Sequence, residues 1–134
     1  MKIEIITLCE AAMVSHDKLN IIGAFESVYT PAVPVTQRAC TLALRMRFER
    51  IEEGDHKLRI HVIDADGHAV IPAINGEIIV RFGEEDKSCL ANLFFSLGEL
   101  RFANYGYYSI EFAINGRHEA SLPLEVRKAI PATV

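Results

Sequence analysis

Strict alternation of apolar and polar residues is the feature that most constrains the fold of this chain. In residues 40–48, the apolar side chains that alternate with Thr, Ala and Arg are Cys40, Leu42, Leu44, Met46 and Phe48. The same pattern returns in residues 58–62, 108–114 and 120–126. Because successive strand residues point to opposite faces, alternation with a period of two is typical of a strand with one face in a core. The sequence therefore predicts a β-protein.

Turn residues separate the alternating runs. Asn115-Gly116 stands between two of them, and this dipeptide favours a hairpin because both central residues of the turn need a positive φ. Asp66-Gly67 is a second turn of this kind. The strands that we expect lie at residues 2–14, 19–29, 38–50, 57–64, 68–71, 76–82, 88–97, 106–114 and 117–127. Many short strands separated by turns are typical of an antiparallel sandwich or barrel.

Length and charge narrow the class of protein further. The 134 residues suffice for one core, and we expect a single domain over residues 1–134. The formal net charge is −4, so the chain lacks the excess of basic residues that binding to nucleic acid or to an anionic membrane requires. We therefore expect neither partner. Glu4 and Glu10 interrupt the apolar run at the start, which argues against a signal peptide, and no stretch is long enough to span a membrane.

The three cysteines are sparse and lie in apolar surroundings. Cys9, Cys40 and Cys89 form no pair at metal-binding or redox spacing. Free cysteine is among the most buried residue types, so we expect three reduced thiols in the core. Together with the absence of a leader pattern, this predicts a cytoplasmic protein.

Residues 90–126 resemble the C-terminal half of an immunoglobulin-like sandwich. Gly106-Tyr107-Tyr108 opens the penultimate predicted strand after a long corner, and this is similar to the tyrosine corner of such domains. The chain has no Trp and no cysteine pair suited to an inter-sheet disulfide, so it does not resemble antibody domains. The resemblance implies an all-β fold, an antiparallel immunoglobulin-like β-sandwich.

Most of the chain is similar to an uncharacterised bacterial family of small cytoplasmic immunoglobulin-like β-sandwich proteins. The segments that carry the resemblance are Leu8-Cys9-Glu10-Ala11-Ala12, Lys18-Leu19-Asn20-Ile21-Ile22-Gly23-Ala24-Phe25, Gly54-Asp55-His56-Lys57-Leu58-Arg59-Ile60 and Asp66-Gly67. His16-Asp17 departs from the family pattern, which has Gly before Lys at the first turn. The resemblance implies a sandwich of unknown function and supplies no catalytic residue.

Acidic residues stand in two predicted loops. If every strand reverses direction, one end of the sandwich collects Asp64, Asp66, Glu84, Glu85 and Asp86. Carboxylate oxygens from separate loops are ligands for a hard divalent cation, so these residues are candidate metal ligands. The alternative is that they are solvated loop tips that keep the protein soluble.

The predicted hairpin of residues 38–50 and 57–64 gives its outward face an unusual charge pattern. It places Arg47 opposite Arg59 and Arg45 opposite His61, and like charges directly opposed across strands are unfavourable. We expect Glu111 to neutralise them. The alternative is an acidic partner surface or a small anion.

No catalytic residues or cofactor site can be assigned. Ser15-His16-Asp17 has the residue types of a triad, but consecutive residues cannot converge as a triad requires, and they favour a turn. We therefore expect no enzymatic activity and no cofactor, and interpret the protein as a binding or assembly module. The alternative is a ligand- or cation-binding sandwich that uses the acidic loops.

Apolar residues outside the predicted core indicate a protein contact. In residues 88–97 the side chains of Leu90 and Phe94 fall on the face opposite the core. The corner at 98–105 could cover them; otherwise we expect a homodimer or a contact with another protein. The residues of this candidate interaction surface are Leu90, Phe94, Arg45, Arg47 and Arg59.

Overall fold

The computed structural model describes residues 1–129, and its regular structure is almost entirely β-strand. The strands are β1 (Lys2–Ser15), β2 (Lys18–Ala24), β3 (Ser27–Thr30), β4 (Val35–Gln37), β5 (Thr41–Glu49), β6 (Gly54–Asp64), β7 (Ile74–Val80), β8 (Ser88–Ser96), β9 (Leu100–Phe102), β10 (Gly106–Ile114) and β11 (Arg117–Lys128). One turn of 3₁₀-helix, η1 (Arg50–Glu52), joins β5 to β6. Within the described residues, no helix is long and apolar enough to cross a membrane.

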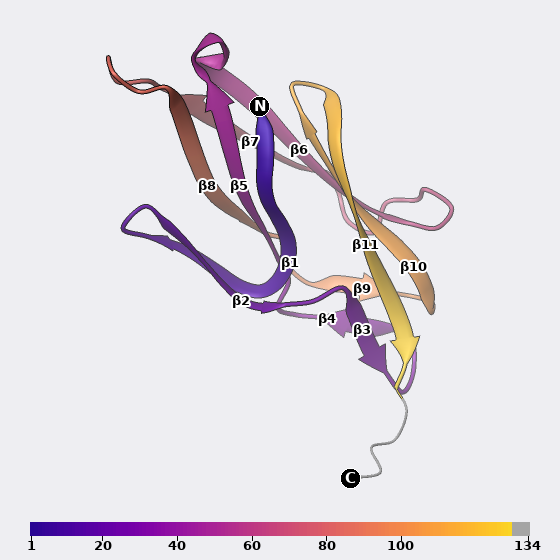
Figure 1. Cartoon of the computed structure of the whole chain (residues 1–134). Coiled ribbons are helices and arrows are strands. Elements are labelled where there is room, and N and C mark those ends of the chain that lie inside the picture. Colours follow the sequence, from indigo (N-terminus) through magenta and orange to yellow (C-terminus); the bar gives the residue numbers. More distant parts are fainter. Residues whose placement is uncertain (130–134) are drawn as a thin grey trace.

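Two curled sheets form the body of the protein (Figure 1). The first has the strand order β2-β1-β5-β8, and the second has the order β3-β11-β10-β6-β7. All pairings are antiparallel except that of β3 with β11, which is parallel. A short ribbon of β4 and β9 completes the fold. The prediction of an all-β, largely antiparallel protein is therefore confirmed.

Both sheets contribute to one hydrophobic core. The alternating runs seen in the sequence supply it, because β5, β6, β10 and β11 each turn every second residue inward. The largest fully buried side chains are Phe48, Phe102, Phe112, Leu8, Leu42, Leu44, Met46, Leu58, Ile60, Leu100, Ile110 and Leu124. Burial of this apolar surface is the main term that stabilises the fold.

Two predicted strands differ from the observed ones. The predicted strand 19–29 is divided at Phe25 and Glu26, where the chain leaves the first sheet as β2 and joins the second as β3. Residues 68–71 form no strand and make only an isolated bridge between Ile63 and Ala69. The predicted corner at 98–105 contains β9, whose Leu100 and Phe102 are fully buried.

The predicted pairing of residues 38–50 with 57–64 is wrong. β5 pairs with β1 and β8, whereas β6 pairs with β10 and β7 in the other sheet. The two strands face each other across the core, so each still buries its apolar side. Arg47 and Arg59 are consequently not opposed, and the unfavourable charge pattern does not arise.

A hairpin arm, residues 10–24, extends from the first sheet (Figure 1). The first part of β1 pairs with β5 as far as Cys9, and the rest pairs only with β2. His16 and Asp17 form the turn with φ values of 51° and 60°. Positive φ at both central residues is typical of a tight hairpin turn, so the interpretation of Ser15-His16-Asp17 as a turn is confirmed.

Candidate functional site

A β-bulge places Glu4 on the outward face of the first sheet. Ile3 lies opposite Met46 and Ile5 lies opposite Arg45, so that β1 has one residue more than β5 at this point. An extra residue of this kind interrupts the alternation and redirects side chains. Both Glu4 and Ile5 are therefore exposed, although they are neighbours along the strand.

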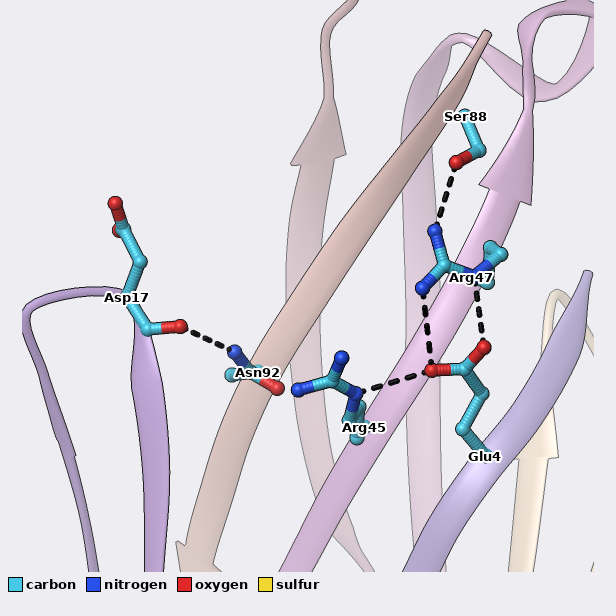
Figure 2. A network of polar contacts seen from close by, with 6 residues as sticks. All are labelled: Glu4, Asp17, Arg45, Arg47, Ser88 and Asn92. Carbon is cyan, nitrogen blue, oxygen red and sulfur yellow. Dashed lines mark hydrogen bonds and ion pairs between the residues drawn. The ribbon is translucent and has the colours of Figure 1, made fainter.

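Glu4 forms ion pairs with both arginines of β5 (Figure 2). Its Oε1 accepts a hydrogen bond of 3.0 Å from Arg45 Nε, and its Oε2 accepts one of 2.7 Å from Arg47 Nε. Arg47 Nη1 also donates to Ser88 Oγ on β8 at 2.7 Å. The guanidinium groups of Arg47 and Arg45 lower the pKa of Glu4 to about 2. The network thus links the side chains of β1, β5 and β8, three neighbouring strands of the first sheet.

Glu111, the residue expected to neutralise the arginines, belongs to the other sheet and has other partners. It accepts hydrogen bonds from Ser109 Oγ at 2.8 Å and from Ser121 Oγ, and it lies 2.7 Å from His118 Nε2. Partial burial raises the pKa of Glu111, but the hydrogen bonds from Ser121, His118 and Ser109 outweigh it, so the net pKa is lowered. The prediction that Glu111 compensates the arginines of β5 is wrong.

Ser121, His118 and Glu111 have the residue types of a catalytic triad, and the sequence reading missed them. Their positions in the sequence match no catalytic motif, because the pairing of β10 with β11 brings these side chains together only when the hairpin forms. Their geometry is not that of a catalytic triad, because Ser121 Oγ and Glu111 Oε2 both contact the same ring nitrogen, His118 Nε2. A triad needs the acid on one imidazole nitrogen and the nucleophile on the other. The cluster is therefore suited to joining the two strands.

Arg59 does not belong to the same surface as Arg45 and Arg47. It lies on the second sheet, opposite Ala113 on one side and Asn75 on the other. Its side chain is exposed. The candidate interaction surface is therefore divided, with Arg45, Arg47, Leu90 and Phe94 on the first sheet and Arg59 apart from them.

Asp64 stabilises the turn that follows β6. Its Oδ1 accepts hydrogen bonds from the backbone N–H groups of Asp66, at 2.9 Å, and His68, at 2.8 Å. These bonds, that from His68 first, lower the pKa of Asp64. One ligand atom each of Asp64, Asp66 and His68 lies within 4.8 Å of the others. The two aspartates are thus near each other, and His68 is a neighbour that the sequence reading did not include.

Glu84, Glu85 and Asp86 lie at the opposite end of the molecule. Arg50 donates to the carbonyl oxygens of Gly83, at 2.8 Å, and Asp86, at 2.7 Å, so this loop adjoins the start of β6. Asp64 ends that eleven-residue strand, which is about 35 Å long. The predicted gathering of five carboxylates is wrong. Because residues 68–71 form no strand, the chain changes direction one time fewer than expected between Asp64 and Glu84. The loop with Asp64 and Asp66 and the loop with residues 84–86 therefore lie at opposite ends of the molecule.

His56 is fixed by two hydrogen bonds beside a cavity of about 290 Å³. Its Nε2 lies 2.6 Å from the carbonyl oxygen of Glu52, which can only accept, so Nε2 carries the proton. Its Nδ1 then accepts from Asn115 Nδ2 at 2.9 Å. With both nitrogens engaged, the ring has no free lone pair for a metal or a substrate proton.

The edge of β8 borders a groove of about 560 Å³. β8 pairs only with β5, and β7 pairs only with β6, so each presents one edge without a backbone partner among the described residues. The residues that line the groove are Val14, Asp17, Ile78, Ile79, Val80, Cys89, Leu90, Ala91, Asn92 and Leu93. Leu90 is partly buried there, while Phe94 is 45% exposed. The corner at 98–105 does not cover Phe94, since its Leu100 and Phe102 enter the core.

The tip of the hairpin arm reaches β8 (Figure 2). Asn92 Nδ2 donates a hydrogen bond of 3.0 Å to the carbonyl oxygen of Asp17. Asn92 Oδ1 is buried and has no hydrogen-bond partner, the one such side-chain atom within residues 1–129. A buried polar atom without a partner is costly, and Figure 2 shows this oxygen on the side of Asn92 that faces Arg45.

These features define a small all-β protein in which β7 and β8 each have an edge without a backbone partner among residues 1–129, and in which polar clusters join the strands. The chain belongs to a family of unknown function, DUF6941, whose model matches residues 4–127. The expected membership of an uncharacterised family is thereby confirmed at this coarser level. A comparison with curated proteins finds no match.

Proposed function

We propose that this protein is a non-enzymatic assembly module of the bacterial cytoplasm, built on an immunoglobulin-like sandwich, which associates with itself through the region around β8. The strand order supports the immunoglobulin-like fold. β1-β5-β8 corresponds to strands A-B-E of such domains, and β11-β10-β6-β7 corresponds to G-F-C-C′. The hydroxyl of Tyr108 donates to the carbonyl of Asn104, as in a tyrosine corner. Three free cysteines agree with a cytoplasmic location.

The observation that carries the assembly role is the composition of β8. Its nine residues, Ser88–Ser96, contain no charged residue and no proline. Natural edge strands are normally shortened or protected by such residues, because an open edge pairs with other chains. The other sheet edges follow this rule: β2 carries Lys18, β7 carries Glu77, and β3 has only four residues. In an immunoglobulin-like domain, the place beside β8 belongs to strand D.

Exposed apolar side chains strengthen the proposal. Phe94 is 45% exposed on the outward face of β8, and Ile79 on β7 is 59% exposed. Apolar groups beside an open edge mark a surface that another protein covers. The polar clusters support a role without catalysis, since Glu4, Glu111, Asp64 and His56 each have partners within the protein.

The oligomeric state at micromolar concentration tests this proposal. We expect the wild type to sediment as a dimer and Phe94→Glu to sediment as a folded monomer, because a charge cannot be buried without a partner. The matched control is Tyr107→Glu, which changes an aromatic residue that is 68% exposed on the second sheet and should leave the dimer intact. A monomeric wild type would contradict self-association.

A second candidate function is cation binding at Asp64, Asp66 and His68, favoured by the closeness of their ligand atoms. Calcium or zinc should then raise the melting temperature of the wild type and not that of Asp66→Asn, since a ligand that binds the folded state stabilises it. Identical melting curves with and without the ion would exclude this candidate.

A further inference from the structure

We propose that the hairpin arm, residues 10–24, is a hinged strap that closes the groove between β7 and β8 and controls access to it. The arm bends at Gly23, and its tip is held by the contact of Asp17 with Asn92 (Figure 2). This inference goes beyond the proposed function, because it concerns a movement within one chain and requires no second copy. The groove is covered or open according to the position of the arm.

The arm is weakly attached to the body of the protein. Beyond its base at Cys9 and Ala24, and within residues 1–129, it forms no ion pair with the rest of the chain, and its one hydrogen bond joins Asp17 to Asn92. None of residues 10–24 is buried. A hairpin of two strands is marginally stable on its own, and segments with few buried side chains are those that open locally. The arm is thus suited to opening while the core stays folded.

Gly23 gives the base of the arm its bend. Its φ of 66° lies in the left-handed region that favours glycine, and a glycine inside a strand marks a bend or a bulge. It lies level with Glu10, directly after the point at which β1 stops pairing with β5. A Cβ added to Gly23 would lie 2.9 Å from Cδ of Glu10, so this side chain packs directly against the glycine. The bend therefore lies where the arm leaves the sheet, which is the position of a hinge.

The tip of the arm forms one wall of the groove. Val14 and Asp17 line it together with residues of β7 and β8. Strand alternation and cross-strand pairing place Leu19 and Ile21 on the same face of the arm as Val14, and both are partly buried. Met13 on the opposite face is 54% exposed. An apolar face of the arm is thus turned toward a groove of about 560 Å³ that is lined largely by apolar side chains.

Asn92 is suited to holding the tip because its amide has different neighbours on its two sides. Its Nδ2 donates a hydrogen bond of 3.0 Å to the carbonyl oxygen of Asp17, and Figure 2 shows its Oδ1 on the side that faces Arg45. A carbonyl oxygen can only accept and a guanidinium can only donate, so this orientation of the amide is favourable. Aspartate at this position could not donate to Asp17.

The native thiol of Cys89 reports the state of the arm. Cys89 lines the groove and is partly buried, whereas Cys9 and Cys40 lie in the core. The rate at which Cys89 reacts with a chromogenic thiol reagent therefore measures access to the groove. Hydrogen exchange of the backbone amides in residues 10–24 measures opening of the arm in the same full-length protein.

Asn92→Asp should raise both rates about tenfold, because it removes the donor and sets an acceptor against the carbonyl oxygen of Asp17. The matched control is Asn75→Asp, which makes the same change of charge at an exposed residue of β7 and should leave both rates unchanged. Each variant is also made in the Phe94→Glu background, so that cover by a second copy is not mistaken for closure of the arm.

Val14→Ser weakens the seat of the arm from its other side and should also raise both rates. Met13→Ser, its matched control on the opposite face, should not. Val14→Ser carries the test alone if Asn92→Asp does not fold, since Val14 is 40% exposed and its replacement leaves the core intact.

Rates equal to those of the wild type in both Asn92→Asp and Val14→Ser would overturn the strap. An equal effect of Met13→Ser would also overturn it, as would an equal acceleration of exchange in β5, because the whole protein would then be opening. The proposed function fails separately: a monomeric wild type contradicts self-association, while the two rates alone decide whether the arm closes the groove.

Discussion

The hydroxyl group of Tyr108 donates a hydrogen bond of 2.9 Å to the carbonyl oxygen of Asn104, four residues earlier in the chain. The ring of Tyr108 also packs edge-on against Phe102, with the ring centroids 4.6 Å apart. Through these two contacts a single side chain fixes the corner between β9 and β10. The corner in turn sets the direction in which β10 enters the second sheet.

Replacing Tyr108 with Phe should lower the free energy of unfolding by about 1 kcal/mol, because the ring packing stays and one hydrogen bond is lost. Urea denaturation measures this difference. Tyr107→Phe is the matched control, since Tyr107 is exposed and its hydroxyl has no role in the corner; we expect its effect to stay within about 0.5 kcal/mol. Equal effects of the two substitutions would contradict a role for the corner bond.

Gly116→Val should destabilise the protein by about 2 kcal/mol. Gly116 has a φ of 80° in the turn between β10 and β11, and a β-branched residue is strained in this region. An added Cβ meets no atom within 4 Å, so the cost comes from the backbone alone. Gly116→Asn should therefore retain most of the stability, because Asn tolerates a positive φ. A midpoint of chemical denaturation unchanged by Val would refute this account.

Local sequence signals predicted the local parts of this fold. The Asn115-Gly116 turn is confirmed, with positive φ at both residues and Ile114 paired with Arg117. The alternating runs are strands, because the period of two reflects burial directly. The partners of β5 could not be predicted in the same way. Either face-to-face packing with β6 or side-by-side pairing buries the same apolar residues, and only the complete topology distinguishes them.

The stability that Glu4 contributes should depend on pH. Its pKa is lowered to about 2 from an ordinary value near 4.5, so its ion pairs with Arg45 and Arg47 contribute fully at a pH above the ordinary value. As the pH falls from about 4.5 to about 2, the unfolded chain takes up a proton before the folded protein does, and the contribution is lost. We expect the difference in free energy of unfolding between wild type and Glu4→Gln to be constant above about pH 5 and to shrink below it.

Urea titrations of both proteins between pH 7 and pH 2.5 measure this difference. Added salt should reduce it at neutral pH, because the ion pairs are partly exposed and ions screen them. A difference that is as large at pH 2.5 as at pH 7 would show that Glu4 acts through packing and not through its charge.

The cysteines should differ in their reactivity. Cys9 and Cys40 are almost completely buried, and burial raises the pKa of both thiols, that of Cys40 to about 12. The thiolate is the reactive form, so neither should react in the native protein near neutral pH. Titration with a chromogenic thiol reagent should therefore detect at most one thiol per chain, Cys89, which is only partly buried. All three should react in denaturant, and rapid native reaction of two thiols would contradict this prediction.

Tertiary structure determines the candidate site to a greater degree than local sequence does. The outward position of Phe94 follows from the alternation, and its side chain is exposed as expected. The pairing of Glu4 with Arg45 and Arg47 depends on a β-bulge in β1, and no residue pattern in the sequence predicts this bulge. The openness of the β8 edge depends on strand order, because a strand is an edge only by virtue of its neighbours.

The parallel pairing of β3 with β11 has a consequence for the order in which the chain folds during synthesis. β3 ends at Thr30, yet the strand beside it starts at Arg117 and pairs with it through residues 125–128. A ribosome must therefore release the chain as far as residue 128 before β3 has its neighbour β11, whereas the hairpin of β1 and β2 closes as soon as it emerges. Until then Val28, which is buried in the finished protein, stays uncovered. The edge of the nascent second sheet that β3 will occupy thus stays incomplete until β11 has been made.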